Sequence, residues 1–332
     1  MKNILLLQTG GTIAMQMKSG EPELDPETWG SLLQKEIPEL SEIADLSVEK
    51  IFFEDSSDVN RYHWKLLAES IYQRYSRFDG FVVLHGTDTM AYTASALSFA
   101  LQGISKPMIF TGSQVPMSNI RSDARRNLVN AVELATLPVP EIAICFNDHL
   151  YRGNRSTKMS IGDFDAFASP NYPLLAEVGI DIRLSNFIAE PGHKLECNPE
   201  FDDAVHVVKL HPNLNPAFLN CIDLSLAKAV IIEAFGSGNF PRKGDYNMLP
   251  FVEKCRESDC QVILTSQAAY DSVDLSLYSS GTAAKKLGAL SGGDMTMEAT
   301  ITKTMHLLSS DLADDQFKMQ FEANLAGERN SD

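Results

Sequence analysis

Hydroxyl groups placed directly after predicted strands are the side chains with which this chain could do chemistry. Thr12 follows two glycines at the end of an apolar run, and Thr87 and Asp88 follow another apolar run. A free threonine hydroxyl is a weak nucleophile and needs a base or a polarising partner. Lys158, if the fold brings it beside Asp88, could orient that carboxylate and move protons. Backbone N–H groups of the glycine turns could stabilise an oxyanion, so the set suits acyl transfer from an amide or ester.

These residues also have plain structural interpretations, which stay open at this point. A Gly-Gly-Thr turn can be an ordinary tight turn. Helix N-termini prefer Ser, Asn and Asp, so the polar cluster 54–58 could cap the helix that follows it. Capping is also the simpler role for Asp88 or Thr89 when that turn is considered alone. Arg152 and Arg155 are most simply surface or ion-pair residues.

The motifs of several other kinds of site are missing from the sequence. Two glycines follow the first strand, but neither Gly-x-Gly-x-x-Gly nor Gly-x-x-x-x-Gly-Lys-Ser/Thr occurs there, which argues against a nucleotide site. The chain also lacks a Gly-x-Ser-x-Gly elbow and a His-Glu-x-x-His zinc signature. Its 5 cysteines are odd in number and have no zinc spacing, so we expect reduced thiols. We therefore expect no cofactor and no metal.

Composition limits the partners and the location of the protein. The chain has 332 residues, 44% of them apolar, which is enough for a substantial core. Its formal net charge of −16 repels phosphate backbones, so we expect no nucleic-acid partner. No apolar run approaches the ~18 residues of a membrane span, and Met1 leads into a strand without a signal region. We expect a cytoplasmic protein without a membrane partner.

Short apolar runs followed by polar turns predict the elements that position these residues. Five strands are predicted: one that begins at Ile4, one that begins at residue 51, and the runs 81–84, 108–111 and 142–146. The predicted helices are 61–75, 91–101 and 122–134. This strand–loop–helix order is typical of a parallel sheet with helices on both faces. The polar turns follow their strands, so we expect them at the carboxyl edge, where open α/β sheets bind ligands.

A change in composition divides the chain into two predicted domains. Residues 187–204 contain Pro191, Gly192 and Pro199 with little periodicity, which favours a linker. We therefore expect an N-terminal domain at 1–186 and a C-terminal domain at 205–332. Further expected elements are strands at 205–210, 229–233 and 262–265 and helices at 249–257 and 300–308. The predicted fold class is α/β, with a larger N-terminal, mostly parallel sheet flanked by helices and a smaller C-terminal α/β domain.

Two separate stretches resemble the two signature motifs of the L-asparaginase family. They are Thr-Gly-Gly-Thr-Ile-Ala at 9–14 and His-Gly-Thr-Asp-Thr-Met at 85–90. Further matches lie at 55–58, 111–114 and 151–155, and residues 162–171 are especially similar to the cytoplasmic bacterial type I enzymes. The similarity runs from residue 3 to about residue 310. It implies hydrolysis of L-asparagine to L-aspartate and ammonia, in a homodimer or homotetramer whose active site lies near a subunit contact.

The resemblance also implies roles for individual residues. Thr12 would be the nucleophile that forms the acyl-enzyme, and Thr87, Asp88 and Lys158 would form a second catalytic group. Asp88 would also hold the α-ammonium group of the amino-acid substrate, and Ser56 its α-carboxylate. The implied substrate-binding residues are Asp55, Ser56, Ser57, Thr87, Asp88 and Ser113.

Two departures from the family pattern affect activation and regulation. Family members usually carry a tyrosine in the loop after the first threonine, but residues 16–26 contain none, and this stretch could be a lid or a plain surface connection. Cooperative type I enzymes carry an arginine and a cysteine in the second domain, where this chain has Glu233 and Ala268. We therefore expect no allosteric control by asparagine.

Two alternative functions share this resemblance. The ammonia-supplying subunit of a tRNA-dependent amidotransferase carries an additional amino-terminal β-domain, whereas here the first signature begins within ten residues of the start. A lysophospholipase-like or purely binding relative would carry ankyrin repeats, and no such repeat is visible here. Both points favour the asparaginase.

Overall fold

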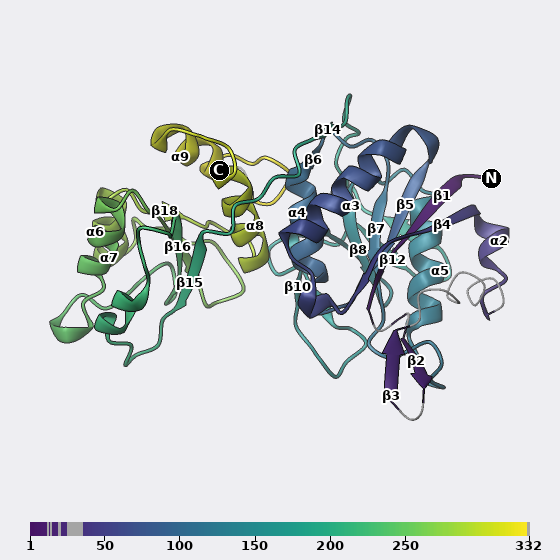
Figure 1. Cartoon of the computed structure of the whole chain (residues 1–332), viewed down its shortest axis with the longest axis horizontal. Helices are drawn as coiled ribbons and strands as arrows, with labels where there is room; N and C mark the ends of the chain where they lie inside the picture. Colours follow the sequence, from purple (N-terminus) through teal and green to yellow (C-terminus); the bar gives the residue numbers. More distant parts are fainter. Residues whose placement is uncertain (12, 14, 19–20, 25–35, 331–332) are drawn as a thin grey trace. The chain divides into compact units, whose positions relative to one another are not determined.

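The chain folds into two compact units, which are described separately here. The computed structural model describes residues 1–11, 13, 15–18, 21–24 and 36–330. Unit 1 spans Met1–Pro199 and unit 2 spans Glu200–Asp332 (Figure 1). All of the candidate site residues named above belong to unit 1.

Unit 1 is built on an eight-stranded sheet with the order β13-β12-β9-β8-β7-β5-β1-β4 (Figure 1). Neighbouring strands from β4 to β8 are parallel, and those from β8 to β13 are antiparallel. The strands are β1 Asn3–Gly10, β4 Asp45–Glu54, β5 Gly80–Leu84, β7 Met108–Thr111, β8 Ile142–Phe146, β9 His149–Arg152, β12 Ala176–Val178 and β13 Ile182–Leu184. The continuous apolar runs of β1, β5, β7 and β8 are buried throughout, as expected for parallel strands covered on both faces.

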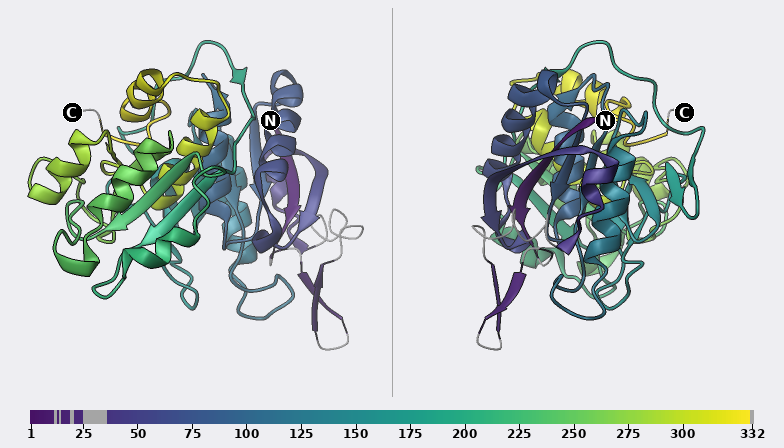
Figure 2. Two further views of the ribbon diagram at one scale, coloured as in Figure 1. Left: turned by 60° about the vertical axis from the view of Figure 1, so that its left-hand side comes forward. Right: turned by 90° about the vertical axis from the view of Figure 1, so that its right-hand side faces the viewer.

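Helices cover both faces of this sheet (Figure 2). The main ones are α3 Arg61–Arg74, α4 Met90–Ala100 and α5 Ala124–Ala135, with the short α2 at Leu40–Ile43. Ile4 and Leu6 share a buried cluster with Leu128 of α5. Because successive strand residues point to opposite faces, Phe81 points to the other face, where its ring stacks on Tyr75 at the end of α3. The sheet is therefore fixed from both sides, which gives its carboxyl edge a rigid base.

Three small two-stranded antiparallel sheets also lie in the described part of unit 1. They are β2 Met15–Lys18 with β3 Glu21–Leu24, β6 Leu101–Gln102 with β14 Glu196–Cys197, and β10 Thr157–Lys158 with β11 Phe167–Ala168. The first pair lies in the stretch after Thr12 whose structure the sequence did not define. The third pair carries Lys158.

The segment expected to be a linker is largely part of unit 1. Ala189 N–H donates to the carboxylate of Glu141 at 2.6 Å, and Gly192 N–H donates to Ile104 O at 2.7 Å. β14 then pairs with β6, so the division between the units falls after Pro199. The segment 187–204 takes part in these contacts through its backbone groups, and amino-acid composition carries no information about such contacts.

Unit 2 contains a four-stranded parallel sheet in the order β15-β16-β17-β18 (Figure 1). Its strands are β15 Val205–Lys209, β16 Ala229–Ala234, β17 Gln261–Ser266 and β18 Leu290–Ser291, and its helices are α6 Leu249–Glu257, α7 Ser279–Lys286, α8 Met297–Leu308 and α9 Asp314–Glu322. Lys303 of α8 is fully buried and donates to Phe321 O, Ala323 O and the carboxylate of Glu328 at 2.5–2.7 Å. A buried cation thereby fastens the last residues of the chain to the unit.

The predicted α/β fold class, with its larger mostly parallel sheet and smaller second domain, is confirmed. Predicted helices 61–75, 91–101 and 122–134 correspond to α3, α4 and α5 within two residues at each end. Helices α7 and α9 and strand β9 were not predicted. All five cysteines are free. In the part of the chain that the structure describes, no helix combines the length and the apolar character needed to cross a bilayer.

Candidate active site

Three turns interlock at the carboxyl ends of β1, β4 and β5. Gly10 and Gly11 have φ angles of +108° and +85°, which favour glycine. A Cβ on Gly10 would lie 2.2 Å from Glu54 O, and one on Gly11 would lie 2.5 Å from Gly86 Cα. Gly11 N–H also donates to Glu54 O at 3.3 Å. Thr12 lies outside the described residues, but the turn that precedes it is fixed against the 85–88 turn.

The second predicted group comes together in space. Lys158 Nζ donates to Thr87 Oγ1 at 2.7 Å and to Asp88 Oδ1 at 2.6 Å, although these residues lie 71 and 70 positions away along the chain. The lysine side chain is 15% exposed, whereas that of Asp88 is 65% exposed. Pairing of β10 with β11 holds the lysine backbone in place. The ammonium group can therefore polarise the threonine hydroxyl while water still reaches the carboxylate.

Helix capping is not the role of Asp88 or Thr89, contrary to the simpler interpretation of the sequence. Thr89 occupies the N-cap position of α4, but its side chain makes no capping hydrogen bond. Its hydroxyl instead donates to Ser56 O at 2.6 Å and ties this turn to the next one. The carboxylate of Asp88 accepts from Lys158. Tertiary contacts at the sheet edge have replaced the local cap.

The polar cluster 54–58 contains one buried residue, Ser56, and four exposed ones. Ser56 is 5% exposed and lies against Gly86, where a Cβ would come within 2.7 Å of Ser56 Oγ. Asp55 Oδ1 accepts from both Ser57 N–H and Ser57 Oγ at 2.8 Å, and these bonds lower the pKa of Asp55. Asp55 and Ser57 thus stabilise the 3₁₀ turn Ser56–Asp58. The following helix α3 is capped by Asn60 instead of this cluster.

The turn after β7 carries Ser113 and Gln114, and Gln114 contacts Thr87. Ser113 is 1% exposed, and its hydroxyl finds no hydrogen-bond partner among the described residues. Gln114 accepts from Thr87 Oγ1 at 3.2 Å through Oε1, and its Nε2 donates to Ser160 O at 3.2 Å and Asp163 O at 3.1 Å. No role could be predicted for Gln114 from the sequence, because its partners lie 27 to 49 positions away along the chain. An unpaired buried hydroxyl is unfavourable unless a ligand or water completes it.

A buried histidine supports the second signature from behind. His85 is fully buried, and burial lowers its pKa to about 4, so the ring is neutral near pH 7. Its Nδ1 lies 2.8 Å from Gly86 O and its Nε2 lies 2.9 Å from Thr93 Oγ1, which in turn accepts from Trp64 Nε1 at 3.1 Å. Since Gly86 O can only accept, Nδ1 carries the proton and Thr93 donates to Nε2. His85 lies within the second signature motif, but its contacts could not be predicted from the sequence.

The two arginines expected on the surface or in ion pairs are both buried. Arg152 forms a bidentate pair with Glu141, at 2.6 and 2.8 Å, which agrees with the ion-pair interpretation. Arg155 is 1% exposed and donates to Asn171 O at 2.9 Å, so it is not a surface residue. It is the last residue of the 3₁₀ turn Gly153–Arg155, which leads into β10 and Lys158.

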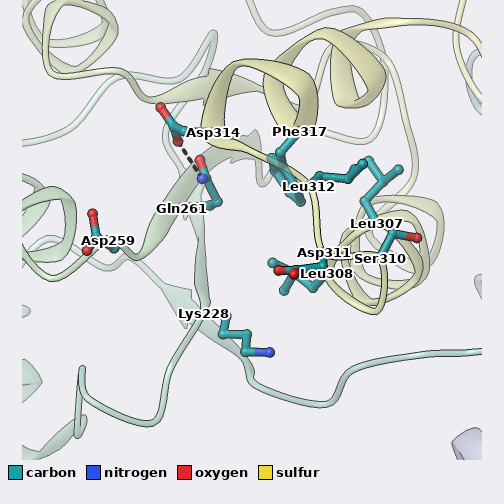
Figure 3. Close-up of a pocket in the computed structure, with 10 residues that line it drawn as sticks. All are labelled: Lys228, Asp259, Gln261, Leu307, Leu308, Ser310, Asp311, Leu312, Asp314 and Phe317. Carbon is teal, nitrogen blue, oxygen red and sulfur yellow. Dashed lines mark hydrogen bonds between the residues drawn. The ribbon is translucent and has the colours of Figure 1, made fainter.

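A separate cavity of about 340 Å³ lies within unit 2 (Figure 3). Lys228 immediately precedes β16 and Gln261 begins β17, so the cavity lies at the amino ends of parallel strands. Ligands in open α/β sheets bind at the opposite edge. Lys228 also pairs with Asp202 at 2.6 Å, and Asp314 pairs with Arg256 at 3.0 Å. We assign this cavity no catalytic role.

Comparisons with known proteins agree with this geometry. Residues 3–189 match the family described as "Asparaginase, N-terminal", and residues 204–321 match "Glutaminase/Asparaginase C-terminal domain". The chain is 38% identical over 340 aligned positions to L-asparaginase 1 of Escherichia coli strain K12, covering 100% of this chain and 99% of that protein. The solved thermostable L-asparaginase from Thermococcus kodakarensis has a TM-score of 0.91 at 32% identity, covering 99% of this chain and 100% of that chain. L-asparaginase I from Vibrio cholerae has a TM-score of 0.89 at 35% identity, with 99% of each chain covered.

Proposed function

The chain belongs to the asparaginase family of amidohydrolases, and we propose that it hydrolyses L-asparagine to L-aspartate and ammonia. The observation that carries this proposal is the position of Lys158 Nζ, within hydrogen-bond distance of both Thr87 Oγ1 and Asp88 Oδ1. The 85–88 turn that carries Thr87 and Asp88 contacts Gly11, the residue before Thr12, through Gly86. A threonine hydroxyl polarised by a lysine suits the group that manages protons while the hydroxyl of Thr12 is acylated.

In the proposed first step, Thr12 Oγ attacks the carboxamide carbon of asparagine. The hydroxyl proton passes to a basic group, and the C–N bond breaks as the nitrogen takes up a proton and leaves as ammonia. The product is an aspartyl ester of Thr12. Water then attacks the ester carbonyl, and the proton returned to Thr12 Oγ regenerates the enzyme and releases aspartate.

Thr87, Asp88 and Lys158 act as the proton-handling group in this scheme. The Lys158 ammonium donates to Thr87 Oγ1 and so stabilises negative charge that develops there. Asp88 compensates the lysine charge, and because its carboxylate is largely exposed, it also has room to accept from a substrate ammonium group.

The remaining candidate residues would hold the substrate. Ser56 is buried against Gly86 and, in this proposal, donates to the α-carboxylate. Ser113 offers a buried hydroxyl without a partner in the described part of the chain, as a group reserved for a substrate oxygen would. Asp55 and Ser57 act through the turn they stabilise. An oxyanion must be stabilised by a donor other than Gly11 N–H, because Glu54 O already accepts from that group.

The proposal includes a setting for the enzyme. A substrate of amino-acid size and a formal charge of −16 support a cytoplasmic protein that binds neither nucleic acid nor membrane. Homodimer or homotetramer formation belongs to the proposal as well, since the family resemblance suggests it.

The test is the release of ammonia from L-asparagine by the purified protein, with L-glutamine and a lysophospholipid as parallel substrates. We expect ammonia from asparagine and its loss in Thr12→Ala, with circular dichroism and Tm unchanged. Near wild-type turnover in Thr12→Ala would refute the nucleophile. Fatty-acid release without ammonia would favour the lysophospholipase-like alternative, and ammonia release that requires glutamine and an amidotransferase partner would favour the other alternative. The choice between asparagine and glutamine depends on pocket shape, because the two differ by one methylene.

A further inference from the structure

We infer that Gln114 is a positioning residue that fixes the direction of the Thr87 O–H bond, an inference that rests on the proposed function. The glutamine amide bridges the Thr87 hydroxyl and the loop that follows Lys158. Lys158 Nζ approaches the same hydroxyl at 2.7 Å. Thr87 Oγ1 therefore has two neighbours, an amide and an ammonium group, and the arrangement of its proton depends on both.

Two backbone carbonyls determine which end of the Gln114 amide faces Thr87. Ser160 O and Asp163 O can only accept hydrogen bonds, so the NH₂ group of Gln114 must face them, at 3.2 and 3.1 Å. The reversed amide would place Oε1 against two carbonyl oxygens, and both would lose their donor. Oε1 therefore points to Thr87, and the Thr87 hydroxyl must donate to it.

This orientation leaves the lone pairs of Thr87 Oγ1 facing the lysine. An ammonium group has three donors and no acceptor, so Lys158 must donate in its contact with Thr87. The Gln114 acceptor and the Lys158 donor thus require the same hydroxyl orientation. A threonine hydroxyl that donates to Gln114 and accepts from Lys158 keeps one lone pair, which can accept a hydrogen bond from water. That is the polarity the proposed second group needs.

The backbone of Gln114 is held independently of its side chain. Gln114 N–H donates to both carboxylate oxygens of Asp123 at 3.0 and 3.1 Å, and Val115 N–H donates at 3.2 Å. Asp123 is 4% exposed and also accepts from Asn127. Replacing the Gln114 side chain should leave this turn in place. Any change in catalysis can then be attributed to the amide.

The first test replaces the amide and compares two controls. In Gln114→Leu we expect kcat to fall about 10- to 100-fold, the scale reported for misaligned catalytic groups, with KM changed less than about threefold. Gln102→Leu is the matched control, because Gln102 also donates to two backbone carbonyls, those of Ser98 and Phe99, outside the site. It should leave both constants unchanged.

The second control separates hydroxyl alignment from simple attachment of the loop. Ser160 Oγ accepts from Gly162 N–H and Asp163 N–H, so Ser160→Ala loosens the same loop without touching Thr87. We expect Ser160→Ala to lower kcat much less than Gln114→Leu. Equal losses in the two variants would overturn the inference, because they would show that the loop attachment alone matters.

The second test uses the pH dependence of kcat. In Gln114→Glu the protonated carboxyl has one O–H donor for a loop carbonyl and one C=O acceptor for Thr87, so it reproduces half of the amide's donors. The ionised carboxylate only accepts and faces two carbonyl oxygens. The ratio of kcat in Gln114→Glu to kcat in wild type should fall as pH rises through the carboxyl pKa. A ratio independent of pH would contradict the inference.

The last test does not depend on turnover, so that it stands apart from the proposed function. Side-chain amide signals of Gln114 in ¹⁵N NMR spectra, assigned by their loss in Gln114→Leu, should exchange slowly with solvent and shift in Thr87→Val. Unmoved signals in Thr87→Val would refute the Thr87–Gln114 bond. If the signals shift in Thr87→Val but the wild-type protein releases no ammonia, the proposed function is refuted and the Thr87–Gln114 bond remains supported.

Discussion

Replacing Lys158 by methionine removes one ammonium group from the candidate site and keeps most of the aliphatic stem. The substitution removes the two hydrogen bonds that Lys158 Nζ donates, to Thr87 Oγ1 at 2.7 Å and to Asp88 Oδ1 at 2.6 Å. Proton-transfer groups typically contribute ~10²–10⁴-fold to a rate. At about 1.4 kcal/mol for each factor of ten, this corresponds to roughly 3–5.5 kcal/mol of lost transition-state stabilisation.

Stability should change far less than the rate. Asp88 is 65% exposed, so water solvates its carboxylate once the lysine is gone. Pairs with an exposed member typically contribute about 0.2–1 kcal/mol to folding. Lys158→Met should therefore unfold at nearly the wild-type temperature while kcat for asparagine falls ~10²–10⁴-fold. This difference separates a catalytic loss from a folding defect.

The assay is ammonia release measured beside thermal unfolding, with one matched control and one diagnostic variant. Lys228→Met removes a lysine–carboxylate contact of the same length, 2.6 Å, in unit 2, and should leave turnover unchanged. Lys158→Arg keeps the charge but cannot give up its proton, so an activity near wild type would limit the lysine to an electrostatic role. Turnover of Lys158→Met within about threefold of wild type would refute the reasoning, since the smallest expected loss is ~10²-fold.

Four further predictions follow from the sequence and the structure. Lys303→Met should destabilise unit 2 by about 3–5 kcal/mol in chemical unfolding, because it removes the ammonium charge that pairs with the buried carboxylate of Glu328. Lys318→Met in α9 should cost less than about 0.5 kcal/mol, and equal losses in the two variants would contradict the argument. Burial lowers the pKa of His85 from 6.5 to about 4, so the unfolded state binds an additional proton between these pH values and the free energy of unfolding should fall as pH drops from 6.5 to 4. His85→Asn should remove this contribution, and a pH dependence of stability that is unchanged in the variant would refute the prediction. Light scattering should show at least a homodimer, and a stable monomer at working concentration would contradict the family-based expectation. The rate should rise hyperbolically with asparagine concentration. Lys209 Nζ lies 3.1 Å from the Glu233 carboxylate and weakens its repulsion of a substrate carboxylate, so this prediction depends on the absence of the arginine that cooperative type I enzymes carry. A sigmoidal curve in both wild type and Glu233→Ala would show that allosteric control lies elsewhere.

Elements with a strong local signal could be predicted from the sequence. The strand predicted at 142–146 is β8 residue for residue, because five consecutive apolar side chains belong to a strand buried on both faces. The helix predicted at 249–257 is α6, where Pro250 in the first turn marks the start. Helix α9 was missed although Phe317 and Phe321 have helical spacing and acidic residues open its first turn. That signal was present in the sequence and was not used.

Contacts between distant segments could not be predicted in the same way. The Lys158–Thr87 contact was expected, but it came from the family resemblance and the need for a proton-handling group; no periodicity shows it. Gln114 was missed because both of its partner segments are remote in the sequence. Helix α7 reads Ser-Ser-Gly-Thr-Ala-Ala-Lys-Lys, and its small residues become helical through packing, as the burial of Ser280, Gly281 and Ala284 shows. Burial of Arg155 likewise depends on segments that fold over it.

The position of β1 in its sheet also determines the order in which the chain can fold as it is made. β1 is synthesised first, yet its two neighbours are β4, which begins at Asp45, and β5, which ends at Leu84. At about 5–20 residues per second, roughly 4–15 s separate the synthesis of Gly10 from that of Leu84. Throughout that interval a strand with the apolar run Ile4–Leu7 has at least one unpaired edge, the feature that promotes pairing with other chains. We therefore expect aggregation to threaten this protein most during its own translation, and least once β5 has closed the second edge of β1.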